Sequence, residues 1–175
     1  MPREEYNSLI SLNKAEKEIC EILAKKRYDQ ARGNKTPNTL VKYSSDFLEA
    51  DREGVYSEMA FCKMVGVYPK FVLTIAVMSV KNGKDFGDVL YKNKNIDVKS
   101  TTHEGGKLIA HSVNPNIDYY ALMVGRSGDY RLAGLMKSDI LCTEERYGHH
   151  KVFRKKCFKA DQEELVSLEE IEKNA

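Results

Sequence analysis

The sequence lacks the closely spaced cysteines of zinc ribbons, thioredoxin-type redox motifs and dense disulfide frameworks. Its four cysteines form no CxxC pair and are spread along the chain at Cys20, Cys62, Cys142 and Cys157. Isolated cysteines of this kind fit a reducing, intracellular compartment. We therefore expect a cytoplasmic protein.

Long hydrophobic runs are also missing. The longest, residues 71–80, is too short to cross a bilayer, which takes about 20 apolar residues. The opening residues, MPREEYNSL, contain no apolar core of a secretory signal peptide. The sequence therefore predicts neither a signal peptide nor a membrane segment.

Neither sign of charge is in large excess, because 28 basic and 26 acidic residues leave a net charge of +2. No global positive field indicates a nucleic-acid partner, but local basic clusters can still bind phosphates, so this balance neither supports nor excludes DNA. With 175 residues, 42% of them hydrophobic, the chain can build one core. We expect an N-terminal helical extension and connection over residues 1–53 and one folded domain over residues 54–175.

Hydrophobic spacing predicts two helices in the first part of the chain. Residues 13–33 carry apolar side chains at helical intervals, and residues 55–65 do the same with Glu58 in their first turns. Residues 34–54 mix turn formers with short apolar patches and are expected to be a connection. The apolar run at residues 71–80 fits a buried strand or a buried helix.

Apolar and β-branched residues predict four strands in the second part of the chain, at residues 86–91, 96–101, 119–124 and 130–136. A basic segment at residues 151–160 is expected to add another strand. No internal repeat or low-complexity tract interrupts this series.

The first two of these strands form a predicted β-hairpin, because DFGDVLY and NIDVKS are joined by the turn-length connection KNKN. If Lys92 opposes Asn95, the register sets Asp88 opposite Lys99. Opposed residues share a face, and so do residues two apart on one strand. Asp88, Asp97 and Lys99 would then project together. A slip of one residue would send Asp88 to the other face.

Two carboxylates and one ammonium group in one place suit the hydrolysis of phosphodiesters. Unit charges about 4 Å apart repel by about 4 kcal/mol at an effective dielectric of about 20, and a hard divalent cation such as Mg²⁺ removes that conflict. Such a cation acidifies a bound water, and Lys99 would orient that water or stabilise the developing negative charge. The alternative is an ordinary exposed ion pair of Asp97 with Lys99, which contributes about 0–1 kcal/mol.

The order of these residues resembles that of the PD-(D/E)xK nuclease superfamily, which has the restriction-endonuclease-like fold. Asp88 occupies the position of the first acid, and the segment DVK at residues 97–99 is the one acid-x-lysine sequence of the chain. A predicted helix bearing Glu58 precedes both. The resemblance covers about residues 54–141 and is strongest to small phage-type members.

Two positions depart from the pattern of the superfamily. Gly87 stands where the nominal motif has proline before the first acid, and Asp97 stands where glutamate is commoner. The proline is often absent in the superfamily. A shorter acid at position 97 shifts the metal but keeps its oxygen ligand.

The resemblance implies an α/β protein with a restriction-endonuclease-like core, in which a central mixed β-sheet is flanked by helices, plus an N-terminal helix. It also implies Mg²⁺ or Mn²⁺ at a metal site formed by Asp88, Asp97, the Val98 carbonyl and Glu58. Lys99 would assist the attacking water, and Glu58 would support a ligand water. The plainer interpretation of Glu58 is an exposed carboxylate near a helix N-terminus.

The function implied by the resemblance is that of a metal-dependent DNA endonuclease, a hydrolase of phosphodiester bonds. One alternative is a Holliday-junction resolvase of the same superfamily, and another is a noncatalytic DNA-binding or assembly protein on a nuclease scaffold. DNA is the expected partner, a homodimer is compatible, and a phage-encoded protein acting inside a bacterial host fits the resemblance. Candidate DNA-binding residues, which solvated surface would explain as well, are His103, Lys107, Arg154, Lys155 and Lys156.

Overall fold

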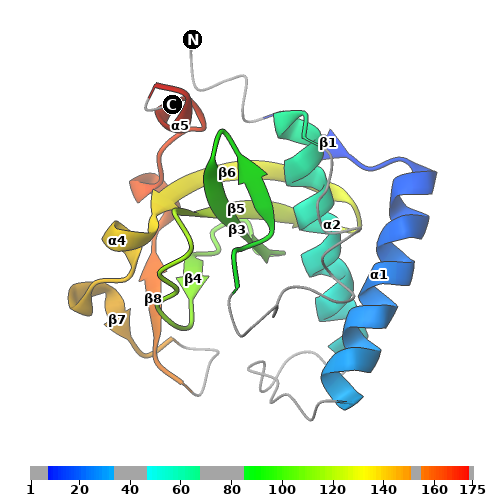
Figure 1. The fold of residues 1–175 in the computed structure, drawn as a ribbon, viewed down its shortest axis with the longest axis horizontal. Coiled ribbons are helices and arrows are strands. Elements are labelled where there is room, and N and C mark those ends of the chain that lie inside the picture. Colours follow the sequence, from blue (N-terminus) through cyan, green and yellow to red (C-terminus); the bar gives the residue numbers. More distant parts are fainter. Residues whose placement is uncertain (1–7, 34–46, 68–84, 151–154, 174–175) are drawn as a thin grey trace.

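The computed structural model describes residues 8–33, 47–67, 85–150 and 155–173. The undecided apolar run at residues 71–80 lies outside these ranges. Two long helices, α1 (Lys14–Gly33) and α2 (Phe47–Val65), run beside each other next to a β-sheet (Figure 1). The shorter helices are α4 (Ser138–Leu141), α5 (Glu169–Lys173) and the 3₁₀ turns Glu144–Arg146 and Gln162–Glu164.

The strands of the described residues form two sheets. They are β1 (Ile10–Ser11), β2 (Val89–Tyr91), β3 (Lys94–Thr101), β4 (Leu108–Ala110), β5 (Tyr119–Arg126), β6 (Asp129–Lys137), β7 (Tyr147–Gly148) and β8 (Cys157–Ala160). The larger sheet has the order β1-β6-β5-β3-β2, in which β3 and β5 are parallel and the other neighbours are antiparallel. The smaller sheet is antiparallel, in the order β4-β8-β7. The protein is therefore the α/β protein that the sequence predicts, with a mixed sheet packed against helices.

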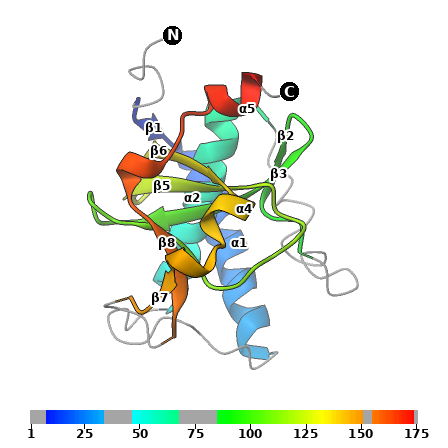
Figure 2. The same ribbon diagram turned by 90° about the vertical axis from the view of Figure 1, so that its left-hand side faces the viewer.

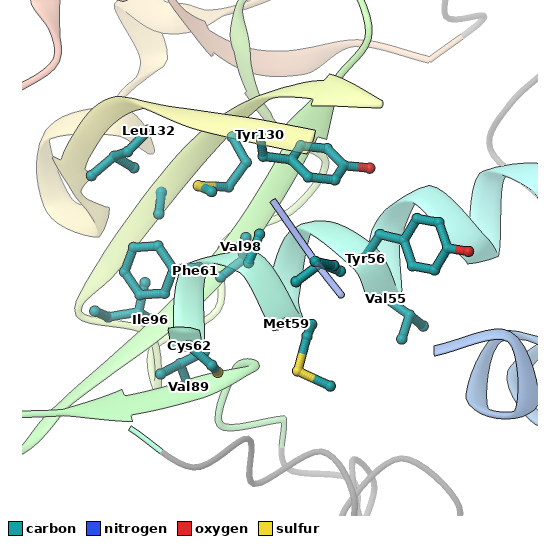
Figure 3. Close-up of a cluster of buried hydrophobic side chains, with 14 of the residues drawn as sticks. Val55, Tyr56, Met59, Phe61, Cys62, Val89, Ile96, Val98, Tyr130 and Leu132 are labelled. Carbon is teal, nitrogen blue, oxygen red and sulfur yellow. The ribbon is translucent and has the colours of Figure 1, made fainter. Parts of the chain in front are cut away.

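Helix α2 packs against one face of the larger sheet. Its Phe61 and Cys62 face the hairpin residues Val89, Ile96 and Val98 (Figure 3), and all five side chains are buried. Ile96 and Val98 share this face because alternate residues of a strand point the same way. The alternation leaves Asp97 and Lys99 on the opposite face of β3.

Helix α1 packs on α2 and begins where the sequence predicts. Asn13 and Glu16 form a capping box: the Asn13 Oδ1 atom accepts from the Glu16 N–H at 2.9 Å, and the Glu16 carboxylate accepts from the Asn13 N–H at 2.7 Å. The Lys63 ammonium of α2 binds the same carboxylate at 2.9 Å. These contacts tie the start of α1 to the end of α2.

Helix α2 begins earlier than the sequence predicts. The expected start at residue 55 is wrong, because the helix already runs from Phe47 and passes through Gly54. A Cβ atom at Gly54 would lie 3.7 Å from Nη1 of Arg27, so this glycine marks the approach of α1 and not a helix end. The division expected between residues 53 and 54 therefore falls inside α2, and α1 belongs to the same packed unit.

The hairpin β2–β3 forms, but its predicted register is wrong. The turn consists of Lys92 and Asn93, both with positive φ of 46° and 61°, so the loop has two residues. The observed pairs are Val89 with Ile96, Leu90 with Asn95 and Tyr91 with Lys94. Each partner is displaced by two residues from its predicted place, and because two is even, the paired residues of β2 and β3 keep their predicted faces, whereas Asp88 lies before β2.

The remaining predicted strands are present with small changes of length. Strands β5 and β6 extend the predictions at residues 119–124 and 130–136, and β8 occupies the end of the basic segment at residues 151–160. Residues 151–154 of that segment lie outside the described ranges. The sequence did not predict β1, β4 or β7, which have only two or three residues each.

The smaller sheet covers the other face of the larger one (Figure 2). Tyr120 and Leu122 of β5 are buried there against Leu108 of β4 and Phe158 of β8. The crossover from β3 to its parallel neighbour β5 contains β4. This connection therefore joins two strands of the larger sheet and also supplies one strand of the smaller sheet.

All four cysteines are free. In the part of the chain that the structure describes, no helix has both the length and the apolar character needed to cross a membrane.

Candidate active site

Asp88 lies on the edge of the larger sheet at the point where β2 stops pairing with β3. Its N–H donates to the Ile96 carbonyl at 2.9 Å, and its carboxylate Oδ2 accepts from the Val98 N–H at 2.7 Å. If β2 continued, a backbone carbonyl of that strand would accept from the Val98 N–H. The Asp88 carboxylate occupies the position of that carbonyl. The backbone groups of one strand residue point to the same side, so the Val98 carbonyl also faces this edge.

Asp97 and Lys99 lie next to each other on β3. The Lys99 Nζ atom is 2.6 Å from the Asp97 carboxylate, and the side chains are 36% and 14% exposed, respectively. The Lys99 ammonium also lies 5.9 Å from the ring centroid of Tyr120, the β5 residue that is paired with Asp97. The pair is thus more enclosed than an ordinary surface ion pair.

The two carboxylates and the ammonium group perturb one another. Burial raises the pKa of Asp88 well above its usual value, the charges of Glu58 and Asp97 raise it further, and Lys99 opposes them. Burial also raises the pKa of Asp97, against the lowering effect of Lys99. Burial alone would lower the pKa of Lys99, but the attraction of Asp97 and Asp88 outweighs it and the pKa is raised. The site therefore holds more negative charge than it neutralises.

Glu58 lies on α2, on the sheet face opposite Asp97 and Lys99, and its carboxylate is paired with Arg27 of α1. The two guanidinium nitrogens of Arg27 donate to the two Glu58 oxygens at 2.8 and 3.0 Å. Glu58 is only 4% exposed, so it is not the exposed helix carboxylate that the plainer interpretation describes. Its expected role of supporting a ligand water stays a prediction.

The part of the chain that the structure describes has no preformed metal site of three protein side chains. Among the described residues, no group of three or more His, Cys, Asp or Glu side chains converges closely enough to hold a cation. Asp88, Asp97 and the Val98 carbonyl supply oxygen ligands near one edge. Mg²⁺ usually keeps several waters and takes only one or two carboxylates from the protein, so this donor set fits Mg²⁺ or Mn²⁺.

The backbone conformation of Gly87 explains why the residue before Asp88 is not proline. Its φ is +73°, which proline cannot adopt, and a Cβ atom there would lie 2.8 Å from the Ile96 carbonyl oxygen. The bend that brings the Asp88 side chain to the Val98 N–H therefore depends on glycine in this position.

The described candidate DNA-binding residues lie in two segments of the chain, one before β4 and one before β8. His103 lies in an exposed turn, Lys107 is paired with the Asp161 carboxylate, and Lys155 and Lys156 are exposed. Arg154 lies outside the described residues. The pKa of His111 is lowered by burial and then by the charges of Lys99, His150 and Lys155, so Lys155 lies within electrostatic reach of His111.

Arg27 and Tyr120 are site residues that the sequence analysis missed. Arg27 follows Cys20, Leu23 and Ala24 at helical spacing, so it is a charged residue on the buried stripe of α1. A single charge on an apolar stripe indicates a buried partner. Tyr120 has no comparable signal, because its place beside Asp97 depends on the parallel pairing of β3 with β5.

Comparisons of the chain with protein-family models, with curated proteins and with solved structures each found no match.

Proposed function

We propose that this protein is a Mg²⁺- or Mn²⁺-dependent DNA endonuclease of the PD-(D/E)xK type. The observation that carries the proposal is the enclosed group of Asp88, Asp97 and Lys99 on one hairpin, with the raised pKa of both carboxylates. Two partly buried acids with one ammonium group are costly for a fold unless a cation compensates them. An ordinary surface ion pair would need neither the second acid nor the enclosure.

Each residue has a separate part in the proposed reaction. Asp88 and Asp97 would hold the cation with the help of the Val98 carbonyl, and the hydrogen bond from the Val98 N–H orients Asp88. Lys99 would orient the attacking water and stabilise charge on the phosphoryl oxygen. When bound, the cation lowers the pKa of a water molecule and neutralises charge on the phosphate.

The test is a cleavage panel in which the protein is incubated with plasmid DNA and with branched DNA, in Mg²⁺, Mn²⁺ or EDTA. We expect cleavage with either metal and none in EDTA. Preferential cutting of the branched substrate would assign the protein to the resolvase class. Undiminished cleavage in EDTA would exclude the proposed mechanism.

Asp88→Asn separates a catalyst from a noncatalytic DNA-binding protein. Metal-dependent cleavage should be lost, whereas DNA affinity measured in EDTA at fixed salt should be equal or higher, because a carboxylate that repels phosphate is gone. A binding protein on a nuclease scaffold would show neither change. Wild-type cleavage by this variant would exclude the assigned site.

A further inference from the structure

Tyr120 is the aromatic residue that β5 places beside the candidate site. In the parallel register of β3 and β5 it is paired with Asp97, and paired residues share a face of the sheet. Lys99 lies two residues further along β3 and shares that face as well. The Lys99 Nζ atom lies 5.9 Å from the centroid of the Tyr120 ring, within the range of a cation–π contact. The ring therefore lies beside the ammonium group that is expected to orient the attacking water.

The Tyr120 side chain is held in place at both of its ends. Its ring is buried in the core between the two sheets, in the same cluster as Leu108 of β4 and Phe158 of β8. Its hydroxyl is hydrogen-bonded to the side chains of Ser138 and Cys142, at the start of α4 and directly after its end. The ring is thus a fixed surface, and its hydroxyl is already engaged by α4.

Lys99 needs a contact of this kind because its other partner has a second task. The ammonium group is paired with the Asp97 carboxylate at 2.6 Å, and Asp97 is also a proposed metal ligand. Lysine has a long, flexible side chain, so one shared carboxylate leaves it several positions. An aromatic ring attracts an ammonium group through its quadrupole, whereas Mg²⁺ takes oxygen ligands. The Tyr120 ring can therefore hold the ammonium group without competing for the metal.

We propose that Tyr120 is a positioning residue that acts through Lys99, because its ring face limits the positions that the Lys99 ammonium group takes. This inference rests on the proposed function, since it concerns the part that Lys99 has in the same reaction. Tyr120 has no chemical step of its own, because its hydroxyl is bound by α4. The ring carries the effect, and the hydroxyl serves to fix the ring.

The first measurement is the order parameter of the Lys99 side chain, from NMR relaxation of its Cε atom, without metal or DNA. The signal is assigned by its absence from Lys99→Ala. Tyr120→Leu should lower the order parameter, because the ring face is lost while the ion pair with Asp97 stays. Tyr120→Phe should keep it, because the ring remains.

The second measurement is DNA cleavage in Mg²⁺. Tyr120→Leu should lower kcat by about tenfold and leave the KM for DNA unchanged, whereas Tyr120→Phe should retain kcat within about threefold. The double variant Tyr120→Leu with Lys99→Ala should cleave no more slowly than Lys99→Ala alone, because Tyr120 acts only through Lys99. A merely structural role of Tyr120 would make the two losses add.

The matched control is Tyr119→Leu, which removes the neighbouring ring on β5. Tyr119 is buried as deeply as Tyr120 but belongs to the core beside α2, so the Lys99 order parameter and kcat should not change. If Tyr120→Leu does not fold, Tyr120→Met removes the ring with a side chain that adapts to the space.

An unchanged Lys99 order parameter in a folded variant without the Tyr120 ring overturns the inference. Additive losses in the double variant overturn it as well. If the wild-type protein cleaves no DNA with either metal, the proposed function fails, whereas the NMR comparison still tests the contact of Tyr120 with Lys99. The two failures are therefore distinguishable.

Discussion

Asp88→Asn should stabilise the protein in the absence of metal, although it removes the proposed activity. Asparagine can still accept the hydrogen bond from the Val98 N–H through its Oδ1 atom, so the edge of the sheet is kept. The substitution removes one negative charge from an enclosed site that also holds Asp97 and Glu58. The gain should therefore be electrostatic and not a change in packing.

The magnitude follows from the contacts of Asp88. Its N–H bonds the Ile96 carbonyl and its carboxylate bonds the Val98 N–H, the two neighbours of Asp97, so the two acids are given the spacing of neighbouring side chains in a sheet, about 5 Å. Two unit charges at that distance repel by about 3 kcal/mol at an effective dielectric of about 20. Lys99 cancels part of this repulsion, which leaves about 1–2 kcal/mol. For a domain of this size, that corresponds to a rise in Tm of about 2–8 °C.

The pH dependence has a definite sign. The pKa of Asp88 is raised by burial and by neighbouring acids, so the folded protein holds this proton more tightly than the unfolded chain does. Wild-type stability therefore falls as the pH rises from the unfolded pKa of Asp88 through its folded pKa. The Asp88→Asn variant has no carboxyl group at this position, so its stability does not fall for this reason. The difference in Tm between variant and wild type should be large at pH 8 and small near pH 4.

The assay is thermal unfolding in EDTA at both pH values, followed by circular dichroism. Asp129→Asn, at an exposed position in β6, is the matched control and should change stability by less than about 0.5 kcal/mol. Added Mn²⁺ should raise the Tm of wild type and not that of Asp88→Asn. A lower Tm for Asp88→Asn at pH 8, or an equal difference at both pH values, would refute the reasoning.

Three further predictions concern single residues around the site and the helices. Lys99→Ala should keep Mn²⁺ binding in calorimetry but lose about 10²-fold in cleavage rate, and a near-normal rate would contradict its role. Gly87→Ala should destabilise the protein by about 1–3 kcal/mol in urea unfolding and reduce cleavage, because its Cβ would meet the Ile96 carbonyl at positive φ. Burial alone would raise the pKa of Glu16, but hydrogen bonds from Lys63 and from the helix start lower it, so its contribution is present at neutral pH and lost as the pH falls through the folded pKa. Glu16→Gln should therefore cost about 1 kcal/mol at pH 7 and almost nothing at pH 3, and an equal loss at both would contradict this.

Local sequence patterns predicted the hairpin and its charged residues well, because alternation in a strand depends only on neighbours. The register was wrong by two residues because the tight turn uses Lys92 and Asn93 in left-handed conformations, and the faces survived because that error is even. The start of α2 was missed because residues 34–54 contain turn formers and were interpreted as a connection, whereas the helix runs from Phe47 through Gly54. These errors were local, because each concerns only residues adjacent in the sequence.

Contacts between distant segments could not be predicted in the same way. The pairing of Arg27 with Glu58 joins two helices, and neither stripe alone identifies its partner. The position of Tyr120 below Lys99 depends on the parallel register of β3 and β5, which the crossover determines. The short strands β4 and β7 have too few residues for alternation to be visible.

The pairing of β1 with β6 has a consequence for how the chain folds. Ile10 pairs with Tyr130, and the Leu12 N–H donates to the Gly128 carbonyl at 2.8 Å. Strand β1 therefore completes one edge of the sheet by pairing with β6, which is synthesised much later. Contacts between such distant residues slow folding. During synthesis, α1 and α2 can pair early, but β1 cannot be secured until β6 has emerged. A chain interrupted before β6 would therefore leave β1 unpaired and the edge of β5 open to association with other chains.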